Sequence, residues 1–383
     1  MRIALVTDTF LPEVNGVTTV LAVMRQGLRE RGHEVLVVAP RYPESTDDEV
    51  GVIRRASVPC PGYAQVRLSL PIGFDVGAAL DRFGPDVVHV ITEGPLGGIG
   101  RRYARRRGVA LVTSFHTDFP RYAARYLGDW AVAPAQRYLR SFHGVAHHTQ
   151  TPSAETRNEL VAQGISQAVV WGRGVDTTLF TPQRRDPARM AAGGATVLHV
   201  GRLAVEKDIE TLIESFVQAH LLLGPTANFV VAGDGPKAAE VRARLPFARH
   251  LGFLPRTVLA DLYANADLFV FPSPTETCGL VALEAMAAAL PVIASDAGGV
   301  LENLRHGLNG RTVAAGNPAA FAAEIADLVR DEPTRRALGQ AARAFAVARS
   351  WANELDALEP LYAAARGRRP ATVQLGTPAL VET

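Results

Sequence analysis

The chain has few cysteines, almost no net charge and no long hydrophobic run. Only Cys60 and Cys278 occur among its 383 residues, which argues against a disulfide framework and favours a reducing compartment. A net charge of +2 gives no basis for binding nucleic acid. No apolar run is long enough to span a bilayer, and the first residues enter a strand pattern without the features of a signal peptide. We expect a cytoplasmic protein whose contact with the cell membrane, where it has one, is peripheral and on the inner face.

Two common nucleotide-binding motifs are also missing. The segment after the first apolar run, Asp8–Gly16, has no Gly-x-Gly-x-x-Gly pattern, which weighs against a dinucleotide-dependent oxidoreductase. The chain has no Gly-x4-Gly-Lys-Ser/Thr pattern, which excludes a P-loop enzyme. Any nucleotide site must therefore be built in another way.

Short β-branched runs alternate with longer amphipathic patterns. Runs that are apolar on both faces are typical of buried parallel strands joined by helices. We expect a first set of strands at 3–7, 35–39, 87–91, 111–114, 145–148 and 169–171, with a helix over Val17–Arg31. We expect a second set at 196–200, 229–232, 268–271 and 292–294, with a helix over Ile209–His220. The pattern predicts an α/β fold with two Rossmann-like, doubly wound domains.

The two sets are separated by Thr181–Gly194, a polar segment with two prolines that ends in paired glycines. We predict an N-terminal domain over 1–180 and a C-terminal domain over 195–350. A change of helix is expected at Asp331–Pro333, and the tail 367–383 is expected to be disordered. Ligands of such sheets bind outside the carboxyl ends of the strands, so we expect the site in a cleft between the domains.

The most informative segment runs from Pro274 to Glu284. It places Glu276 and Glu284 eight residues apart, with a glycine-led apolar helix pattern starting between them. Glu284 is the only charged residue between Glu276 and Asp296, so burying it requires strong hydrogen-bond donors such as a sugar or ribose diol. The amides near Gly279–Val281 suit a phosphate. Together these features favour a sugar nucleotide; the alternative is a glutamate bonded only to backbone amides or to a neighbouring arginine.

Two basic residues follow the first strand of the second domain. Arg202 can grip a pyrophosphate as a fork and Lys207 as a point charge. The alternative is a surface ion pair between Arg202 and Glu206.

Two positions in the first domain also follow predicted strands. Gly16 lets the backbone approach a phosphate at a helix start, although an ordinary tight turn would use the same residue. His116 follows the strand predicted at 111–114 and so faces the expected site; the alternative is a structural or surface histidine.

Taken together, these motifs resemble the retaining GT-B glycosyltransferases of family 4. The segment Glu276–Glu284 matches the family's E-x7-E motif, and Arg202–Lys207, Asn15–Val17 and His116–Asp118 fall where the family has its donor-site elements. The likeness covers residues 1–365 or so. The strings that begin at His116 and at Trp171 are most similar to those of GDP-mannose-dependent α-mannosyltransferases, and next to those of sulfoquinovosyl-diacylglycerol synthases. Cys278 departs from the pattern, because an aromatic or bulky residue is expected there.

The resemblance implies roles for these residues. Arg202 and Lys207 would hold the diphosphate, Glu284 the ribose hydroxyls and Glu276 the hydroxyls of the transferred sugar, while the backbone carbonyl of His116 would lie by the anomeric centre. The other residues implied in the site are Gly16, Gly233, Phe253, Leu254, Cys278, Gly279, Leu280 and Val281 towards the donor, and Asp118 and Tyr122 towards the acceptor.

The resemblance also implies a mechanism. The set holds cations but no evident nucleophile and base pair, which fits charge stabilisation of a leaving diphosphate better than a double displacement. The chain has no Asp-x-Asp pair, so we expect no obligatory metal and no cofactor. Since the family is retaining, departure and attack on the same face are implied. The helix at about 351–366 is expected to cross back to the first domain.

The expected activity is transfer of mannose from GDP-mannose to a lipid or glycan acceptor with α-linkage. Three alternatives stay open: a UDP-sugar-dependent transferase acting on diacylglycerol, a sugar-nucleotide epimerase or hydrolase, and a non-catalytic sugar-nucleotide binder. Nucleic acid is not expected as a partner.

One basic cluster remains outside this set. Five arginines occur in the seven residues 101–107, in a chain whose net charge is near zero. The cluster is either a solvated helix face or a surface that meets anionic lipid headgroups.

Overall fold

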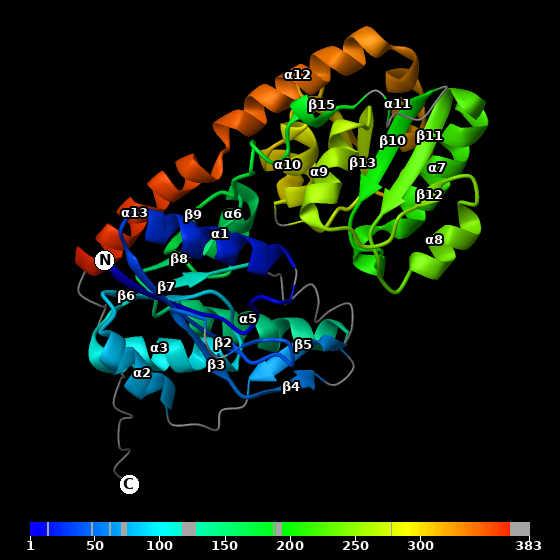
Figure 1. Ribbon diagram of the computed structural model, residues 1–383. Coiled ribbons are helices and arrows are strands. Elements are labelled where there is room, and N and C mark those ends of the chain that lie inside the picture. Colours follow the sequence, from blue (N-terminus) through cyan, green and yellow to red (C-terminus); the bar gives the residue numbers. More distant parts are fainter. Residues whose placement is uncertain are drawn as a thin grey trace. The chain divides into compact units, whose positions relative to one another are not determined.

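A computed structural model describes residues 1–13, 15–46, 49–60, 63–69, 75–116, 128–186, 188, 194–276 and 278–367. The chain forms two compact units (Figure 1). Unit 1 comprises Met1–Thr151, Glu159–Val169 and Ala357–Thr383, and unit 2 comprises Pro152–Asn158 and Val170–Asp356. No helix of the described residues combines the length and apolar character needed to cross a membrane.

Unit 1 is built on a sheet whose described part has seven strands in the order β3-β2-β1-β6-β7-β8-β9. The strand order turns back between β1 and β6, which are parallel neighbours, so the loops that leave these two strands diverge there. Such a switch point is where ligands of doubly wound sheets bind. The strands are β1 (Arg2–Val6), β2 (Glu34–Pro40), β3 (Val52–Arg55), β6 (Val87–Val90), β7 (Ala110–Ser114), β8 (His148–Thr151) and β9 (Ala168–Val170), and a separate antiparallel hairpin joins β4 (Ser57–Cys60) to β5 (Tyr63–Ser69).

The helices of unit 1 follow from caps and apolar faces in the sequence. In the first helix, Asn15 accepts the Thr18 amide through its side chain at 2.9 Å, and the Thr18 hydroxyl accepts the Asn15 amide at 2.9 Å, which closes a capping box. Val20, Met24 and other residues on one face are buried. The helices are α1 (Gly16–Glu30), α2 (Asp75–Phe83), α3 (Pro95–Arg107) and α5 (Val132–His143), with a 3-10 turn η1 (Asp129–Ala131) before α5. The helix α6 (Ala154–Ala162) begins in unit 2 and ends in unit 1.

Unit 2 contains a parallel sheet whose described part has six strands in the order β12-β11-β10-β13-β14-β15. Its switch point lies between β10 and β13. The strands are β10 (Ala195–Val200), β11 (Ala227–Ala232), β12 (Arg249–His250), β13 (Leu268–Phe271), β14 (Val292–Ser295) and β15 (Gly310–Val313). The helices are α7 (Ile209–Leu223), α8 (Ala238–Arg244), α9 (Arg256–Ala264), α10 (Leu280–Ala287), α11 (Pro318–Arg330) and α12 (Glu332–Ala348), with 3-10 turns η2 (Pro182–Arg184), η4 (Val205–Lys207), η5 (Gly224–Thr226) and η6 (Gly299–Glu302).

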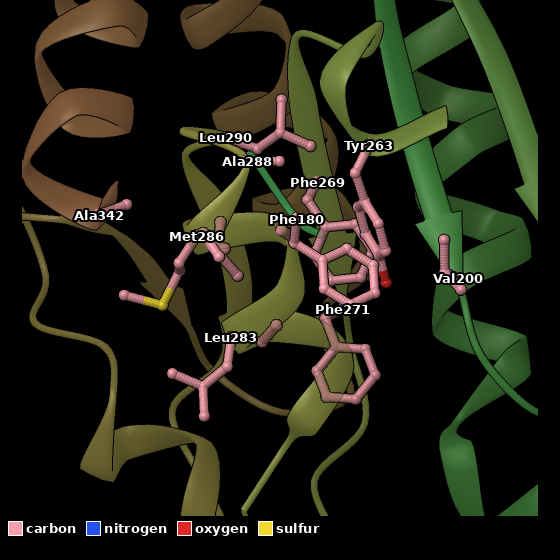
Figure 2. Close-up of a cluster of buried hydrophobic side chains, with 14 of the residues drawn as sticks. Phe180, Val200, Tyr263, Phe269, Phe271, Leu283, Met286, Ala288, Leu290 and Ala342 are labelled. Carbon is pink, nitrogen blue, oxygen red and sulfur yellow. The ribbon is translucent and has the colours of Figure 1, made fainter. Parts of the chain in front are cut away.

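One core of unit 2 lies between its sheet and the helices α9, α10 and α12. Phe180 meets Tyr263 edge to face, with ring centroids 5.7 Å apart, and Phe269 and Phe271 lie beside them (Figure 2). These rings are fully buried or nearly so, which fixes α9 and α10 relative to β13. The core therefore sets the position of both helices that carry the site residues described below.

The last helix, α13 (Trp351–Gly367), begins in unit 2 and ends in unit 1. In unit 1 the Tyr362 hydroxyl lies 2.7 Å from Nδ1 of His89, whose Nε2 lies 2.7 Å from the Ser114 hydroxyl. All three side chains are buried. The C-terminal segment thus completes the core of unit 1.

The predicted parallel strands are present, with one misplaced. The strand expected at 145–148 is β8, which begins only at His148. Residues 144–147 turn instead, with the Ala146 amide donating to the His143 carbonyl at 2.8 Å. The helix change expected at Asp331–Pro333 is confirmed, because α11 ends at Arg330 and α12 begins at Glu332.

Candidate active site

The switch point of unit 2 brings together the loops that follow β10 and β13. Nζ of Lys207, in η4, lies 2.5 Å from Oε1 of Glu276. The Thr275 hydroxyl donates to the Glu206 carbonyl at 2.7 Å, so a second bond ties the same two loops. Both charged side chains of the pair are partly exposed. A cation and a carboxylate are therefore held side by side at the edge of the sheet where ligands bind.

The Glu276 backbone is supported by the loop that follows β14. The Gly299 amide donates to the Glu276 carbonyl at 2.6 Å. Gly298 has a φ of +78°, and a Cβ there would lie about 3.0 Å from the carbonyl oxygens of Pro274 and Glu276. This close approach favours glycine at 298 and fixes the direction in which Glu276 leaves the loop.

Three more loops at the same edge are joined by backbone hydrogen bonds. The Gly201 amide donates to the Ala232 carbonyl at 3.1 Å, and the Gly233 amide donates to the Gly252 carbonyl at 2.7 Å. Gly233 has a φ of +137°, and a Cβ there would lie 1.9 Å from the Gly201 carbonyl oxygen. The loops after β10, β11 and β12 therefore form one continuous rim.

Side chains on this rim differ in exposure. Arg202 is exposed, Phe253 is 64% exposed and Leu254 is partly buried against the core cluster. Arg202 and Phe253 therefore contact solvent at this edge, and Leu254 anchors the loop that carries Phe253.

The start of α10 presents backbone amides at the same edge. Gly279 has a φ of +70° and no side-chain cap, and the helix continues with Leu280 and Val281, which are partly exposed. Free amides at a helix start attract anions. Cys278 is buried, and burial raises the pKa of its thiol to about 11. Its carbonyl accepts from Nδ2 of Asn303 at 2.9 Å, so Asn303 holds the backbone just before Gly279.

Glu284 is buried, and α9 supplies it with two partners. Nη1 of Arg256 lies 3.1 Å from Oε1, and the Tyr263 hydroxyl lies 3.5 Å from Oε2. These residues are seven apart on α9 and share one helix face. Burial raises the pKa of Glu284 to about 7, an effect that Arg256 partly offsets. The neighbouring arginine considered in the sequence is therefore present, and Glu284 is a carboxylate near its titration point.

His199, on β10, lies beneath this edge as an uncharged side chain. Burial lowers its pKa to about 4, and Nδ1 lies 3.0 Å from the Val270 carbonyl. Its ring stacks on Phe271 with centroids 6.5 Å apart. A neutral imidazole in this place packs the strand ends and carries no positive charge at neutral pH.

In unit 1, the loop that leads to Gly16 is held by Glu13. The Glu13 carboxylate accepts from the Thr9 hydroxyl at 2.9 Å, from the Tyr42 hydroxyl at 2.7 Å and from Nδ2 of Asn15 at 3.0 Å. Gly16 is the first residue of α1, directly after the Asn15 cap. The network fixes the backbone at the start of α1, where a phosphate would meet free amides.

His116 is partly buried and follows β7, at the carboxyl end of the sheet of unit 1. Asp118 and Tyr122 lie outside the described residues. Nearby, the Asp8 carboxylate accepts the amides of Leu96 at 2.9 Å and Gly97 at 3.2 Å, and so caps α3. Burial raises the pKa of Asp8, which these hydrogen bonds partly offset.

This arrangement can bind an anion and a polyol at the edge of unit 2. The described residues contain no group of three or more His, Cys, Asp or Glu side chains arranged to hold a metal ion. Positive charge at this edge comes from Lys207, Arg202 and the amides of α10.

Two family descriptions match the chain, one on each half. Residues 14–179 match "Glycosyltransferase Family 4", and residues 182–345 match "Glycosyl transferases group 1". The chain belongs to glycosyltransferase family 4. It is 35% identical over 380 residues to a GDP-mannose-dependent alpha-mannosyltransferase of Mycobacterium tuberculosis, covering 96% of this chain and 98% of the relative. It is 37% identical to a protein of the same name from Mycolicibacterium smegmatis, covering 96% and 99%.

A further relative carries a different printed activity. The sulfoquinovosyl transferase SQD2 of Arabidopsis thaliana is 35% identical over 334 residues, which cover 82% of this chain and 64% of SQD2. The predicted resemblance to family 4 and to both groups of relatives is thus confirmed. The chain is a glycosyltransferase of the hexosyltransferase type.

Solved structures show the same fold. Sucrose-phosphate synthase from Thermosynechococcus elongatus superposes with a TM-score of 0.79 at 21% identity, over 94% of this chain and 98% of that one. Anabaena HepE, solved with UDP, superposes with a TM-score of 0.75 at 20% identity, over 95% and 100%. The predicted α/β fold of GT-B type, with two Rossmann-like domains, is confirmed.

Sequence reasoning missed several residues of this edge. Arg256 and Tyr263 were not predicted as site residues, although a neighbouring arginine was one of the alternative partners considered for Glu284. Gly298 is one of a glycine pair in the loop that follows the strand predicted at 292–294, which was the available signal for a close backbone approach.

Proposed function

We propose that this glycosyltransferase moves mannose from GDP-mannose to a lipid or glycan acceptor with α-linkage. The observation that carries the proposal is the 35% and 37% identity, over nearly the whole chain, to two proteins named GDP-mannose-dependent alpha-mannosyltransferase. The edge of unit 2 supports a sugar nucleotide as donor, because it combines cations, free amides and two carboxylates at a switch point.

The donor would be held by the loops of unit 2. Arg202, Lys207 and the amides of Leu280 and Val281 would bind the diphosphate. Glu284 would accept the ribose hydroxyls, and Glu276 the hydroxyls of the sugar. The rim formed by Gly233, Phe253 and Leu254 would meet the base. Gly16 and His116 belong to unit 1, and their roles towards the diphosphate and the anomeric carbon stay predictions, as do those of Asp118 and Tyr122.

The chemistry would be a retaining transfer without a protein nucleophile or a metal. The C1–O bond to the diphosphate breaks, the acceptor oxygen bonds to C1 on the same face, and the acceptor proton passes to a leaving phosphate oxygen. Lys207 and the α10 amides would stabilise the charge that develops on that phosphate. Lys207 and Glu276 are paired with each other in this structure. When the donor binds, Lys207 would turn part of its hydrogen bonding to the diphosphate, and Glu276 would turn part of its own to the sugar.

A UDP-sugar donor with diacylglycerol as acceptor is the second candidate. It rests on the 35% identity to sulfoquinovosyl transferase SQD2. Calorimetry with GDP, UDP and ADP separates the two candidates, because the proposal requires GDP to bind most tightly.

Product analysis with labelled sugar nucleotides tests the reaction. Label from GDP-mannose should enter a lipid or glycan product only when acceptor is present. Release of free nucleotide or an altered sugar without acceptor would instead indicate a hydrolase or epimerase.

A further inference from the structure

A concave surface lies within unit 1, whereas the donor loops described above belong to unit 2. It is a hollow of about 460 Å³ between α3 and α5, lined by Arg101, Arg102, Arg105 and Arg106 together with Tyr138. A second hollow of about 450 Å³ shares Arg102 and Tyr138 and extends it towards the start of α3. We call this surface the arginine groove.

Helix geometry explains why four arginines share one surface. Positions 101, 102, 105 and 106 are spaced i, i+1, i+4 and i+5, which places them on one face of α3. Arg107 leaves this face and pairs with Asp81 at 2.5 Å, and the Tyr103 hydroxyl donates to the same carboxylate at 3.1 Å. The helix thus separates one neutralised arginine from four that line the groove.

Arg101 forms the wall of the groove nearest α5. Its Nη2 donates to the Ser141 carbonyl at 2.6 Å, and its guanidinium lies 5.5 Å from the centre of the Phe142 ring. Burial lowers the pKa of Arg101, and the nearby Arg105 lowers it further. Arg101 is therefore fixed in place, and the positive charge of Arg105 disfavours the charged form of Arg101.

The other three arginines carry exposed charge. Arg102, Arg105 and Arg106 are exposed, and no carboxylate of the described residues lies within ion-pairing distance of them. Like charges one turn apart destabilise a helix. An anion in the groove would relieve this repulsion.

Aromatic side chains occur in the lining of the groove and in the turn that precedes α5. Tyr138, which is half exposed, donates its hydroxyl to the Glu93 carbonyl. Trp130, in the turn that leads into α5, is 72% exposed. Arginine with exposed tryptophan and tyrosine is typical of surfaces that lie at a membrane–water interface.

We propose that the arginine groove binds the phosphate of an anionic phospholipid headgroup and docks unit 1 on a membrane surface. The guanidinium fork matches phosphate oxygens and supplies two hydrogen bonds at once. The chain as a whole carries only +2, so the field is local to this face and would orient the protein on the bilayer. The docking does not depend on which sugar is transferred.

The test is co-sedimentation of the full-length protein with vesicles, without sugar nucleotide. One set contains phosphatidylcholine alone, and the other contains phosphatidylcholine with phosphatidylglycerol. The protein should pellet with the anionic vesicles at low salt, with at least about tenfold tighter apparent binding than to neutral ones, and high salt should reduce this difference. Equal binding to both vesicles, or binding to neither, overturns the proposal.

A matched pair of triple variants assigns the binding to the groove. Arg102→Gln, Arg105→Gln and Arg106→Gln together should reduce binding to anionic vesicles by about tenfold or more. The control replaces Arg29, Arg157 and Arg336, three exposed arginines outside the groove, with glutamine, so that the net charge falls equally. Equal losses in both triples would mean that net charge, not the groove, drives binding.

A free phosphate ion offers the same oxygen atoms to the groove as a lipid headgroup, so a competition experiment must distinguish the two. Glycerol phosphate and inorganic phosphate are added as competitors at millimolar concentration. Weak competition is expected, because one soluble phosphate lacks the bilayer. Tight binding of inorganic phosphate without binding to anionic vesicles would overturn the lipid assignment. GDP calorimetry on the groove variant should match wild type, so a failure of docking is distinguishable from a failure of the proposed transfer.

Discussion

Glu284 is the residue whose chemistry can be tested most directly through pH. Burial raises its pKa to about 7, so its protonation responds to pH in the neutral range rather than near the usual pKa of a glutamate. A carboxylate that accepts ribose hydroxyls must be ionised, so binding should lower its pKa and release a proton. Affinity for the sugar nucleotide should therefore weaken as pH falls below 7, by up to about tenfold per unit.

Calorimetry of GDP-mannose binding near pH 6, in two buffers of different ionisation enthalpy, measures the released proton. GDP-mannose is suitable because its diphosphate diester does not titrate in this range. Glu284→Gln keeps the shape and should show weaker binding without proton release. Equal proton release in wild type and Glu284→Gln would assign the proton to another group.

Lys207 is expected to act on the leaving diphosphate. Lys207→Ala should lower the transfer rate by about 10²–10³, since an electrostatic donor to the developing charge is lost. Initial rates at saturating donor measure this, and thermal unfolding checks the fold. Lys237, which pairs with Glu240 on α8, provides a matched lysine, and Lys237→Ala should keep its rate. Normal activity in Lys207→Ala would contradict the proposed clamp.

The strand ends of unit 2 depend on glycines that admit no side chain. Gly233→Ala would place a Cβ 1.9 Å from the Gly201 carbonyl oxygen at a φ of +137°. The loops must separate, so we expect a loss of about 1–3 kcal/mol in unfolding free energy and weaker nucleotide binding. Gly224 also has a positive φ, +53°, but open space around it, so Gly224→Ala should cost less and leave nucleotide binding unchanged. Denaturant unfolding and calorimetry compare the two.

Elements differed in how well the sequence predicted them. Runs such as Leu268–Phe271 are apolar on both faces and were identified as buried strands. The strands β3 and β15 were missed because each is short and carries arginine. The hairpin β4–β5 was missed because it lies outside the βαβ pattern.

The residues of the candidate site also differ in how well the sequence predicted them. Residues on loops after strands, such as Lys207 and Glu276, were predictable because parallel strands end at one edge. Arg256 and Tyr263 were not, because they reach Glu284 only through the packing of α9 on α10. That contact depends on Phe180 and the rings around it, which no local pattern encodes.

At the scale of the whole molecule, the core of unit 1 is built from segments far apart in the sequence. The second half of α13 packs with residues from the first half of the chain. Tyr362 is fully buried, and its hydroxyl forms a hydrogen bond with His89. The other ring nitrogen of His89 forms a hydrogen bond with the Ser114 hydroxyl. Glu359 lies 3.1 Å from Nε2 of His33 on the same unit. Unit 1 therefore cannot complete its core until α13 has been made, whereas the donor loops all lie in unit 2.

Tyr362→Ala should separate the stabilities of the two units. Removing a fully buried aromatic side chain costs about 3–5 kcal/mol, and this loss falls on the core of unit 1. We expect calorimetric unfolding to show an earlier first transition while GDP binding keeps wild-type affinity, because the proposed nucleotide contacts are mainly in unit 2. Tyr362→Phe keeps the ring and loses only the hydroxyl bonded to His89, so it should cost about 1–3 kcal/mol and shift the same transition less. If both variants lowered a single transition for the whole chain, the two units would unfold as one, and the core of unit 1 would be coupled to unit 2 more strongly than the shared helix α13 alone requires.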